Sequence, residues 1–182
     1  MNKQTRRSFL KTSLYTGATV AWTAKSWGQV KGANETLRCA TVGFRGRGGS
    51  HIGSITGMQK REQGVKLTAL CDVDKKVLDA GAAKHKVKGY QDIREMLEKE
   101  DLDVVTVATP NHWHTLAAIW AIQAGKDVYV EKPSSHYGWE GRQCVAAAAK
   151  DNRIVQHGTQ NRSSQGKANE IAAVQSGKYG KL

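Results

Sequence analysis

Two polar motifs, each directly after an apolar run, carry the side chains that could take part in acid–base chemistry. The first spans residues 109–114 and holds one threonine and two histidines, and the second is Glu131-Lys132-Pro133. A free lysine has a pKa of about 10.4, so it needs desolvation or a cationic neighbour to act as a base near neutral pH. The carboxylate of Glu131 would instead favour the charged form of the lysine. We therefore expect Lys132 to hydrogen-bond and orient a reacting group rather than to act as the base.

The same residues allow two other interpretations. Lys132 could be a surface lysine after an exposed turn, because Pro133 shows only that the chain turns there. His112 and His114 could be a metal-binding pair with His136 as a third ligand, but no carboxylate or cysteine joins them at ligand spacing. The sequence therefore predicts no metal site. Three widely separated cysteines in apolar runs are typical of small buried hydrophobic residues rather than of a disulfide framework: Cys39, Cys71 and Cys144.

A glycine-rich turn at 43–49 follows the first apolar run of this region. It keeps the first and third glycines of G-x-G-x-x-G but has an arginine at the second. The first glycine can form the tight turn, the third allows close packing, and the N-terminus of the following helix offers free amides to a pyrophosphate. The arginine could compensate by placing its guanidinium near a phosphate. The candidate phosphate-binding residues are Gly43, Arg45, Gly46, Arg47 and Gly48.

An aspartate, Asp72, ends the second apolar run, about 20 residues beyond this turn, where an acid can accept hydrogen bonds from the ribose hydroxyls of a dinucleotide. A carboxylate repels a 2′-phosphate, so NAD is favoured over NADP, although Lys75 and Lys76 could soften that preference. The other interpretation of Asp72 is a helix N-cap, and one carboxylate can serve in both ways.

Apolar runs of strand length alternate with amphipathic segments from Leu37 onward, which is the pattern of a parallel sheet with crossover helices. The predicted strands are 38–44, 65–71, 104–108, 128–130 and 154–156, and the predicted helices are 49–58, 75–85, 93–99, 112–124, 139–150 and 168–176. Gly125 is placed to end a helix in the left-handed conformation, and Asp92 is placed to begin one. We expect an α/β fold with a doubly wound, mostly parallel sheet, which binds its ligands at the carboxyl ends of the strands.

The positive charge of the chain is concentrated at its N-terminus. The formal net charge is +12, and half of it comes from residues 1–34, which contain six basic residues and no acid: Lys3, Arg6, Arg7, Lys11, Lys25 and Lys31. The rest is dispersed among acidic residues, without a basic stripe interleaved with aromatic side chains. The composition therefore argues against a nucleic-acid-binding protein.

The N-terminal segment carries a match to the twin-arginine export signal at 5–11, followed by an uncharged stretch at 12–24. That stretch is shorter than the roughly 20 apolar residues that span a bilayer. We expect residues 1–34 to be a signal peptide and linker, cleaved between Ala24 and Ala33, so that the twin-arginine machinery exports the protein to the periplasm or another extracytoplasmic location. The alternative is a basic N-terminus that contains Arg-Arg by chance.

The turn, Asp72 and the motifs at 109–114 and 131–133 together resemble the family of glucose-fructose oxidoreductase, inositol dehydrogenase and rhizopine-catabolism proteins (Gfo/Idh/MocA). The resemblance covers about residues 36–180. It implies a Rossmann NAD(P)-binding fold in which Lys132 is the catalytic lysine and Glu131 lies near the nicotinamide or its ribose. By the same resemblance, four residues line the nicotinamide end: Thr109, Pro110, Asn111 and His114. Gln160 and Arg162 are further candidates for contact with cofactor or substrate.

The resemblance also predicts the domain organisation. Residues 36–162 would be the dinucleotide-binding domain, and residues 163–182 would begin the connection to a C-terminal α/β substrate domain that brings an aspartate and a histidine toward the lysine. We therefore expect the chain alone to bind NAD weakly without turning over substrate. We also expect the complete protein to form homo-oligomers through that second domain.

The resemblance implies an NAD(P)-dependent oxidoreductase that moves a hydride between nicotinamide and a carbon of a sugar or polyol. One alternative is an NAD-assisted glycoside hydrolase of the same fold, which oxidises its sugar transiently and eliminates the aglycone. The Glu-Lys-Pro motif resembles the dehydrogenases of the family more closely. A second alternative is a noncatalytic nucleotide-binding protein, because a fold does not dictate its function.

Overall fold

The computed structural model describes residues 36–180, so the expected signal peptide lies outside the described residues. Its centre is a six-stranded sheet in the order β3-β2-β1-β4-β5-β6, in which all pairs of neighbouring strands are parallel. The strands are β1 (Leu37–Val42), β2 (Val65–Cys71), β3 (Lys88–Tyr90), β4 (Val104–Val107), β5 (Asp127–Glu131) and β6 (Val155–Gly158). This topology confirms the predicted doubly wound α/β fold.

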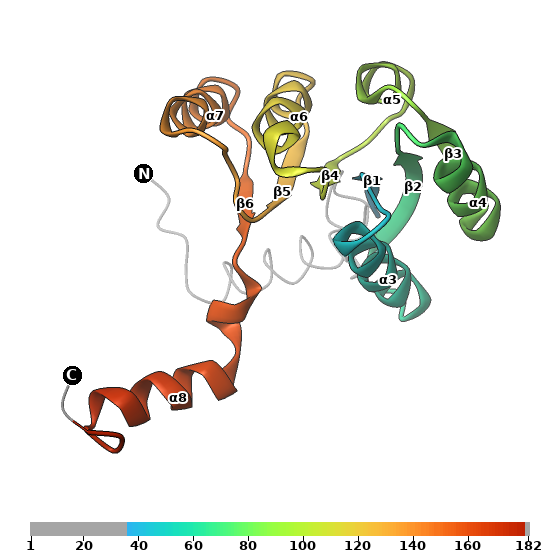
Figure 1. The fold of residues 1–182 in the computed structure, drawn as a ribbon. Coiled ribbons are helices and arrows are strands. Elements are labelled where there is room, and N and C mark those ends of the chain that lie inside the picture. The colour runs from blue at the N-terminus through green and yellow to red at the C-terminus, as the bar shows by residue number, and fades with distance from the viewer. Residues whose placement is uncertain (1–35, 181–182) are drawn as a thin grey trace, which may run out of the picture. The chain divides into compact units, whose positions relative to one another are not determined.

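Helices cover both faces of the sheet (Figure 1). One face carries α3 (Arg47–Lys60) and α4 (Lys75–His85), and the other carries α5 (Ile93–Lys99), α6 (Asn111–Gln123) and α7 (Gly138–Lys150). A 3-10 helix, η1 (Gln160–Ser163), and α8 (Gln165–Gln175) follow β6. Within residues 36–180, no helix is long and apolar enough to cross a membrane.

Two hydrophobic clusters, one on each face of the sheet, hold the strands in place. Val105 and Val107 of β4 are fully buried against Ile122 of α6, while Leu70 of β2 packs with Ile52 of α3 on the other face. Strands buried on both faces explain the continuous apolar runs of the sequence. The packed sheet therefore fixes the carboxyl ends of the strands, where the polar motifs begin.

The predicted elements differ from the observed ones mainly at one edge of the sheet. Strand β3 was not among the predicted strands, and it pairs with β2 through only three residues. The cap of α4 is Asp74, whose side chain accepts from two backbone amides, so Asp72 is not the N-cap. Gly125 has a φ of +75°, and Asp92 accepts from the amide of Arg94, as the sequence predicts.

Candidate functional site

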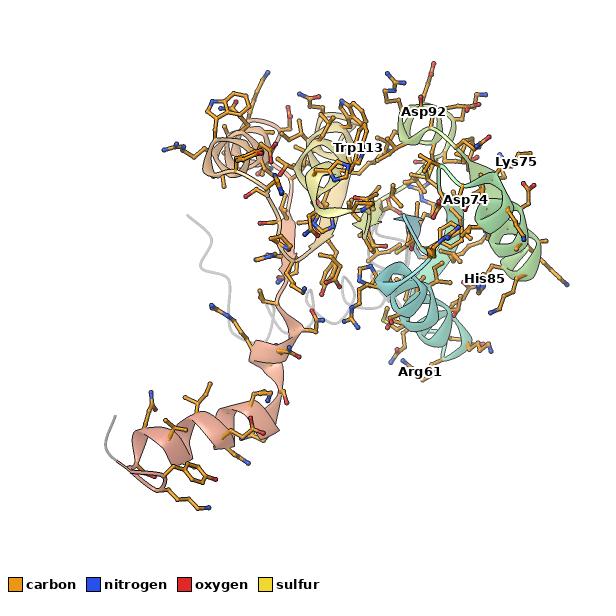
Figure 2. All side chains as sticks on the ribbon, in the orientation of Figure 1. Arg61, Asp74, Lys75, His85, Asp92 and Trp113 are labelled. Carbon is orange, nitrogen blue, oxygen red and sulfur yellow. The ribbon has the colours of Figure 1, made fainter. Side chains whose placement is uncertain are left out.

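The segments after β1, β2, β3 and β4 surround a crevice of about 620 Å³ at the carboxyl edge of the sheet. A volume of this size suits a cofactor or another small molecule. Asp74, Asp92 and Trp113, which line the crevice, are labelled in Figure 2. Seven of the sequence-predicted residues also line it: Gly43, Arg45, Gly46, Arg47, Asp72, Thr109 and Pro110.

The glycine turn is close-packed at two of its four glycines. Gly43 has a φ of +73°, and a Cβ atom there would lie 2.8 Å from the Cα of Thr109. A Cβ on Gly48 would lie 2.0 Å from the carbonyl oxygen of Gly43, a separation that no side chain tolerates. Nothing lies within 4 Å of the corresponding position on Gly46. The turn therefore brings backbone amides at the start of α3 to the crevice, where they can bind a pyrophosphate.

Asp72 joins the turn to the loop after β2. Its Oδ2 accepts a hydrogen bond from the amide of Phe44 at 3.1 Å, and its Oδ1 accepts from the amide of Asp74 at 3.0 Å. A carboxylate has about four lone-pair positions, so acceptor capacity remains for ribose hydroxyls. The guanidinium of Arg45 forms an ion pair with Asp74 at this rim. Any contact between Arg45 and a phosphate therefore competes with Asp74.

Replacing Asp72 with asparagine should lower NADH affinity about tenfold while lowering NADPH affinity less. An amide offers one acceptor oxygen, so it cannot hold both the turn and the ribose, but it no longer repels a 2′-phosphate. Fluorescence titration with both cofactors gives the two dissociation constants. Asp79→Asn, a change of the same kind on an exposed side chain of α4, should leave both unchanged. Equal losses of affinity for NADH and NADPH would show that Asp72 does not discriminate between the two cofactors.

The hydroxyl of Thr109 is buried and has no hydrogen-bond partner among the described residues, although the residue lines the crevice. Buried polar atoms in folded proteins are almost always satisfied, so an orphan hydroxyl at a crevice indicates a ligand partner. Together with the glycine turn and Asp72, this atom makes the crevice fit a dinucleotide.

His114 is buried between the two polar motifs instead of lining the crevice. Its Nδ1 lies 2.6 Å from the carbonyl oxygen of Pro133, and its Nε2 lies 2.8 Å from that of Thr109. Carbonyl oxygens only accept hydrogen bonds, so a protonated ring nitrogen donates to the carbonyl that it faces. Beside it, the hydroxyl of Thr115 donates to the carbonyl oxygen of Ser134 at 2.9 Å. These side chains of α6 hold the loop that follows Lys132.

Glu131 is buried and points toward α3. Its Oε1 lies 3.0 Å from Nε of Arg47 and 2.8 Å from Nε2 of His51. Burial raises the pKa of the carboxyl, but the hydrogen bonds and charges of His51 and Arg47 together outweigh burial and hold the pKa below its usual value. In the part of the chain that the structure describes, Lys132 is exposed and forms no ion pair with Glu131. The carboxylate of Glu131 is therefore engaged by side chains of α3 and not by the lysine.

The lowered pKa of Glu131 predicts a dependence of stability on pH. A carboxyl whose folded pKa is depressed stabilises the fold above its unfolded value, near 4.5, and this contribution is lost as the pH falls through the folded pKa. Glu131→Gln should lower the free energy of unfolding at pH 7 by about 1–3 kcal/mol. Below pH 4.5 its stability should fall less steeply than that of the parent chain.

Urea unfolding at several pH values measures this difference. Glu170→Gln, on an exposed helix, is the matched control and should follow the parent curve. If Glu131→Gln and the parent lost stability equally with acid, the ion pairs of Glu131 would not carry the effect.

Sequence reasoning missed His51 and assigned no structural partner to Arg47. No short-range signal links them to Glu131, since the partners are 80 and 84 positions apart. Gln160 joins the same group when its amide is oriented to satisfy both ends: it accepts from Nη2 of Arg47 at 2.6 Å and donates to the carbonyl oxygen of Gly158. The remaining predicted candidates lie exposed near this edge: Asn111 at the start of α6, and Arg162 in η1. Among the residues described, no cluster of three or more His, Cys, Asp or Glu could hold a metal ion.

The geometry agrees with comparisons to known proteins. Residues 37–159 match the oxidoreductase family whose description is an NAD-binding Rossmann fold, Gfo/Idh/MocA. The chain belongs to the Gfo/Idh/MocA family. Its NAD-binding residues are therefore expected at the carboxyl edge of the sheet, where the crevice lies.

Proteins that resemble the chain include both hydrolases and dehydrogenases by name. A glycosyl hydrolase family 109 protein of Solibacter usitatus is 35% identical over 154 residues, which cover 74% of this chain and 34% of that protein. Myo-inositol 2-dehydrogenase from Lactobacillus plantarum has a TM-score of 0.70 at 27% identity, covering 81% of this chain and 43% of that one. The WlbA dehydrogenase from Bordetella pertussis, solved with NADH and UDP-GlcNAcA, has a TM-score of 0.68 at 25% identity, covering 81% and 44%. This Gfo/Idh/MocA chain thus spans about a third of the length of the Solibacter usitatus protein.

Proposed function

We propose that the protein is an NAD-dependent oxidoreductase acting on a CH–OH group of a sugar or polyol, with NADP as a possible substitute. The observation that carries the proposal is an exposed Lys132 at the end of β5, held at the same sheet edge as a crevice that fits a dinucleotide. When bound, NAD supplies the redox step by accepting or donating a hydride at its nicotinamide ring.

The residues of this chain bind and position the reactants. The ammonium of Lys132 donates a hydrogen bond to the reacting oxygen of the substrate, which orients the carbon toward the cofactor. His114 and Thr115 fix the loop after the lysine, and Arg47 engages the carboxylate that precedes it. The amides of the glycine turn hold the pyrophosphate, and Asp72 holds the adenosine ribose.

We further propose that a second, C-terminal domain supplies the substrate pocket and the group that shares proton transfer with Lys132. The greater length of the relatives supports this proposal, since the aligned region covers 34% to 44% of them. As part of the same proposal, the protein forms homo-oligomers through that second domain.

The test compares the complete two-domain protein with the 182-residue chain against a panel of sugars and polyols. NADH formation followed by absorbance should occur with the complete protein and at least one substrate, while the chain alone should show none. Turnover by the chain alone would contradict the need for a second domain. A complete protein that binds NAD but oxidises no member of the panel would contradict the proposed substrate class.

A second candidate is an NAD-assisted glycoside hydrolase, which is favoured by the 35% identity to a protein named for glycosyl hydrolase family 109. Both candidates use the same residues to orient a sugar hydroxyl beside the nicotinamide. They differ in net redox change. Release of an aglycone from a chromogenic glycoside with no accumulation of NADH would establish the hydrolase, whereas NADH formed in proportion to oxidised sugar would establish the dehydrogenase.

A further inference from the structure

A second groove, of about 730 Å³, lies at the amino edge of the sheet, opposite the edge that holds the cofactor crevice. It is bounded by the start of β2 and the C-terminal ends of α3 and α4, which Arg61 and His85 mark in Figure 2. Four exposed lysines line it, and none forms an ion pair within residues 36–180: Lys60, Lys66, Lys84 and Lys86.

The net charge of the groove is positive even when the acidic residue that lines it is included. Glu100 also lines it, but this carboxylate is bound by the ammonium of Lys88 at 2.8 Å and by the hydroxyl of Tyr90. Burial and the charge of Lys84 lower the pKa of His85, as expected where cations are crowded. Among the residues that the structure describes, the unpaired lysines therefore have no counter-charge in this groove.

Stabilisation of helix ends explains only part of this arrangement. Lysines in the last turns of α3 and α4 complement the helix dipoles, which accounts for Lys60 and Lys84. Lys66 is on a strand, where no helix dipole acts. Lys86 has a φ of +54°, a left-handed conformation in which glycine is usual and a lysine is strained. Because Lys86 is also the C-cap of α4, Lys66 is the lysine of this groove whose charge the helix ends do not explain.

The floor of the groove carries an unsatisfied hydroxyl. In the pairing of β1 with β2, Cys39 pairs with Leu67 and Ala40 pairs with Ala69, so Thr68 is an extra residue in a β-bulge. Bulges redirect side chains. The Oγ1 atom of Thr68 is buried, lines the groove and has no hydrogen-bond partner among the described residues. Such an atom indicates a ligand that supplies the missing partner.

We propose that this groove binds a small molecule with two or more phosphate groups, independently of the cofactor crevice. Lysine ammonium groups bind phosphates as point charges, and several lysines around one groove suit more than one phosphate. The hydroxyl of Thr68 donates to a phosphate oxygen at the floor. The volume of the groove is within the range of small-molecule sites, and it exceeds what a single phosphate would fill.

Inorganic pyrophosphate is the probe, titrated calorimetrically into the 182-residue chain with NADH saturating the crevice. We expect one saturable site. Lys66→Gln combined with Lys86→Gln should weaken binding at least tenfold. Thr68→Val, which keeps the shape and the net charge, should weaken binding about threefold to tenfold. Circular dichroism of each variant confirms that the fold is retained.

The matched control removes the same charge elsewhere, by Lys150→Gln combined with Lys178→Gln, and should change affinity less than twofold. Neither of these lysines lines the groove. An equal loss in both double variants, or an unchanged affinity in Thr68→Val, would mean that pyrophosphate binds by general electrostatic attraction and would overturn the proposal. Absence of saturable binding would overturn it as well.

Discussion

Lys132→Ala in the proposed two-domain protein should lower kcat by about 100- to 10,000-fold, the usual contribution of a positioned acid–base group. NADH affinity should change less than about twofold, because the pyrophosphate and ribose contacts are made by other loops. Lys132 is exposed beside a carboxylate that Arg47 and His51 already engage, so its ammonium is free to meet a substrate oxygen. Stopped-flow hydride transfer and NADH titration measure the two quantities separately.

Lys150→Ala removes the same charge from the end of α7, away from the site, and should leave turnover and binding unchanged. Substitution of Lys132 by arginine tests geometry, since its planar fork cannot reproduce the compact ammonium and should restore little activity. Unchanged turnover in Lys132→Ala would remove the lysine from the reaction while leaving the NAD site intact.

Gly48→Ala should lower the NADH affinity of the chain at least about 100-fold, equivalent to about 2.7 kcal/mol. The added methyl group would lie 2.0 Å from the carbonyl oxygen of Gly43, so the turn must move away from α3. Backbone amides at the helix N-terminus would then lose their alignment with the pyrophosphate. Fluorescence titration at a temperature where the variant remains folded by circular dichroism measures the loss.

Gly49→Ala is the matched control. A Cβ atom there would lie 3.6 Å from the carbonyl oxygen of Phe44, which is an ordinary contact, and alanine favours a helix. Its NADH affinity should remain within about twofold of the parent. Equal losses in the two variants would show that the close approach of Gly48 and Gly43 does not set the binding geometry.

The periodic apolar runs predicted most of the fold because buried parallel strands and amphipathic helices leave strong local patterns. Residues 65–71, 75–85 and 93–99 match the observed β2, α4 and α5 without adjustment. Strand β3 escaped prediction because its sequence, Lys-Gly-Tyr, has no apolar run. Pairing with β2 and burial of Tyr90 hold it in the sheet, and both are tertiary contacts.

The candidate site was predictable where spacing carries the information. Gly43, Gly48 and Asp72 were predictable because the separation between the glycine turn and the aspartate is that of one strand–helix–strand unit. The partners of Glu131 and the contact of His114 with Pro133 were not predictable, because these contacts join segments that follow different strands. That His114 lines the nicotinamide end stays a prediction of the resemblance, and in the structure its ring lies between the backbone carbonyls of Thr109 and Pro133.

The central claim is that a dinucleotide binds across the carboxyl edge of this sheet, with its ribose at Asp72 and its nicotinamide near Lys132. Calorimetric titration of NADH into the chain and into the complete protein tests it most directly. We expect saturable binding with one molecule per chain, weaker in the chain alone. No saturable binding of NADH or NADPH to either protein would contradict the account.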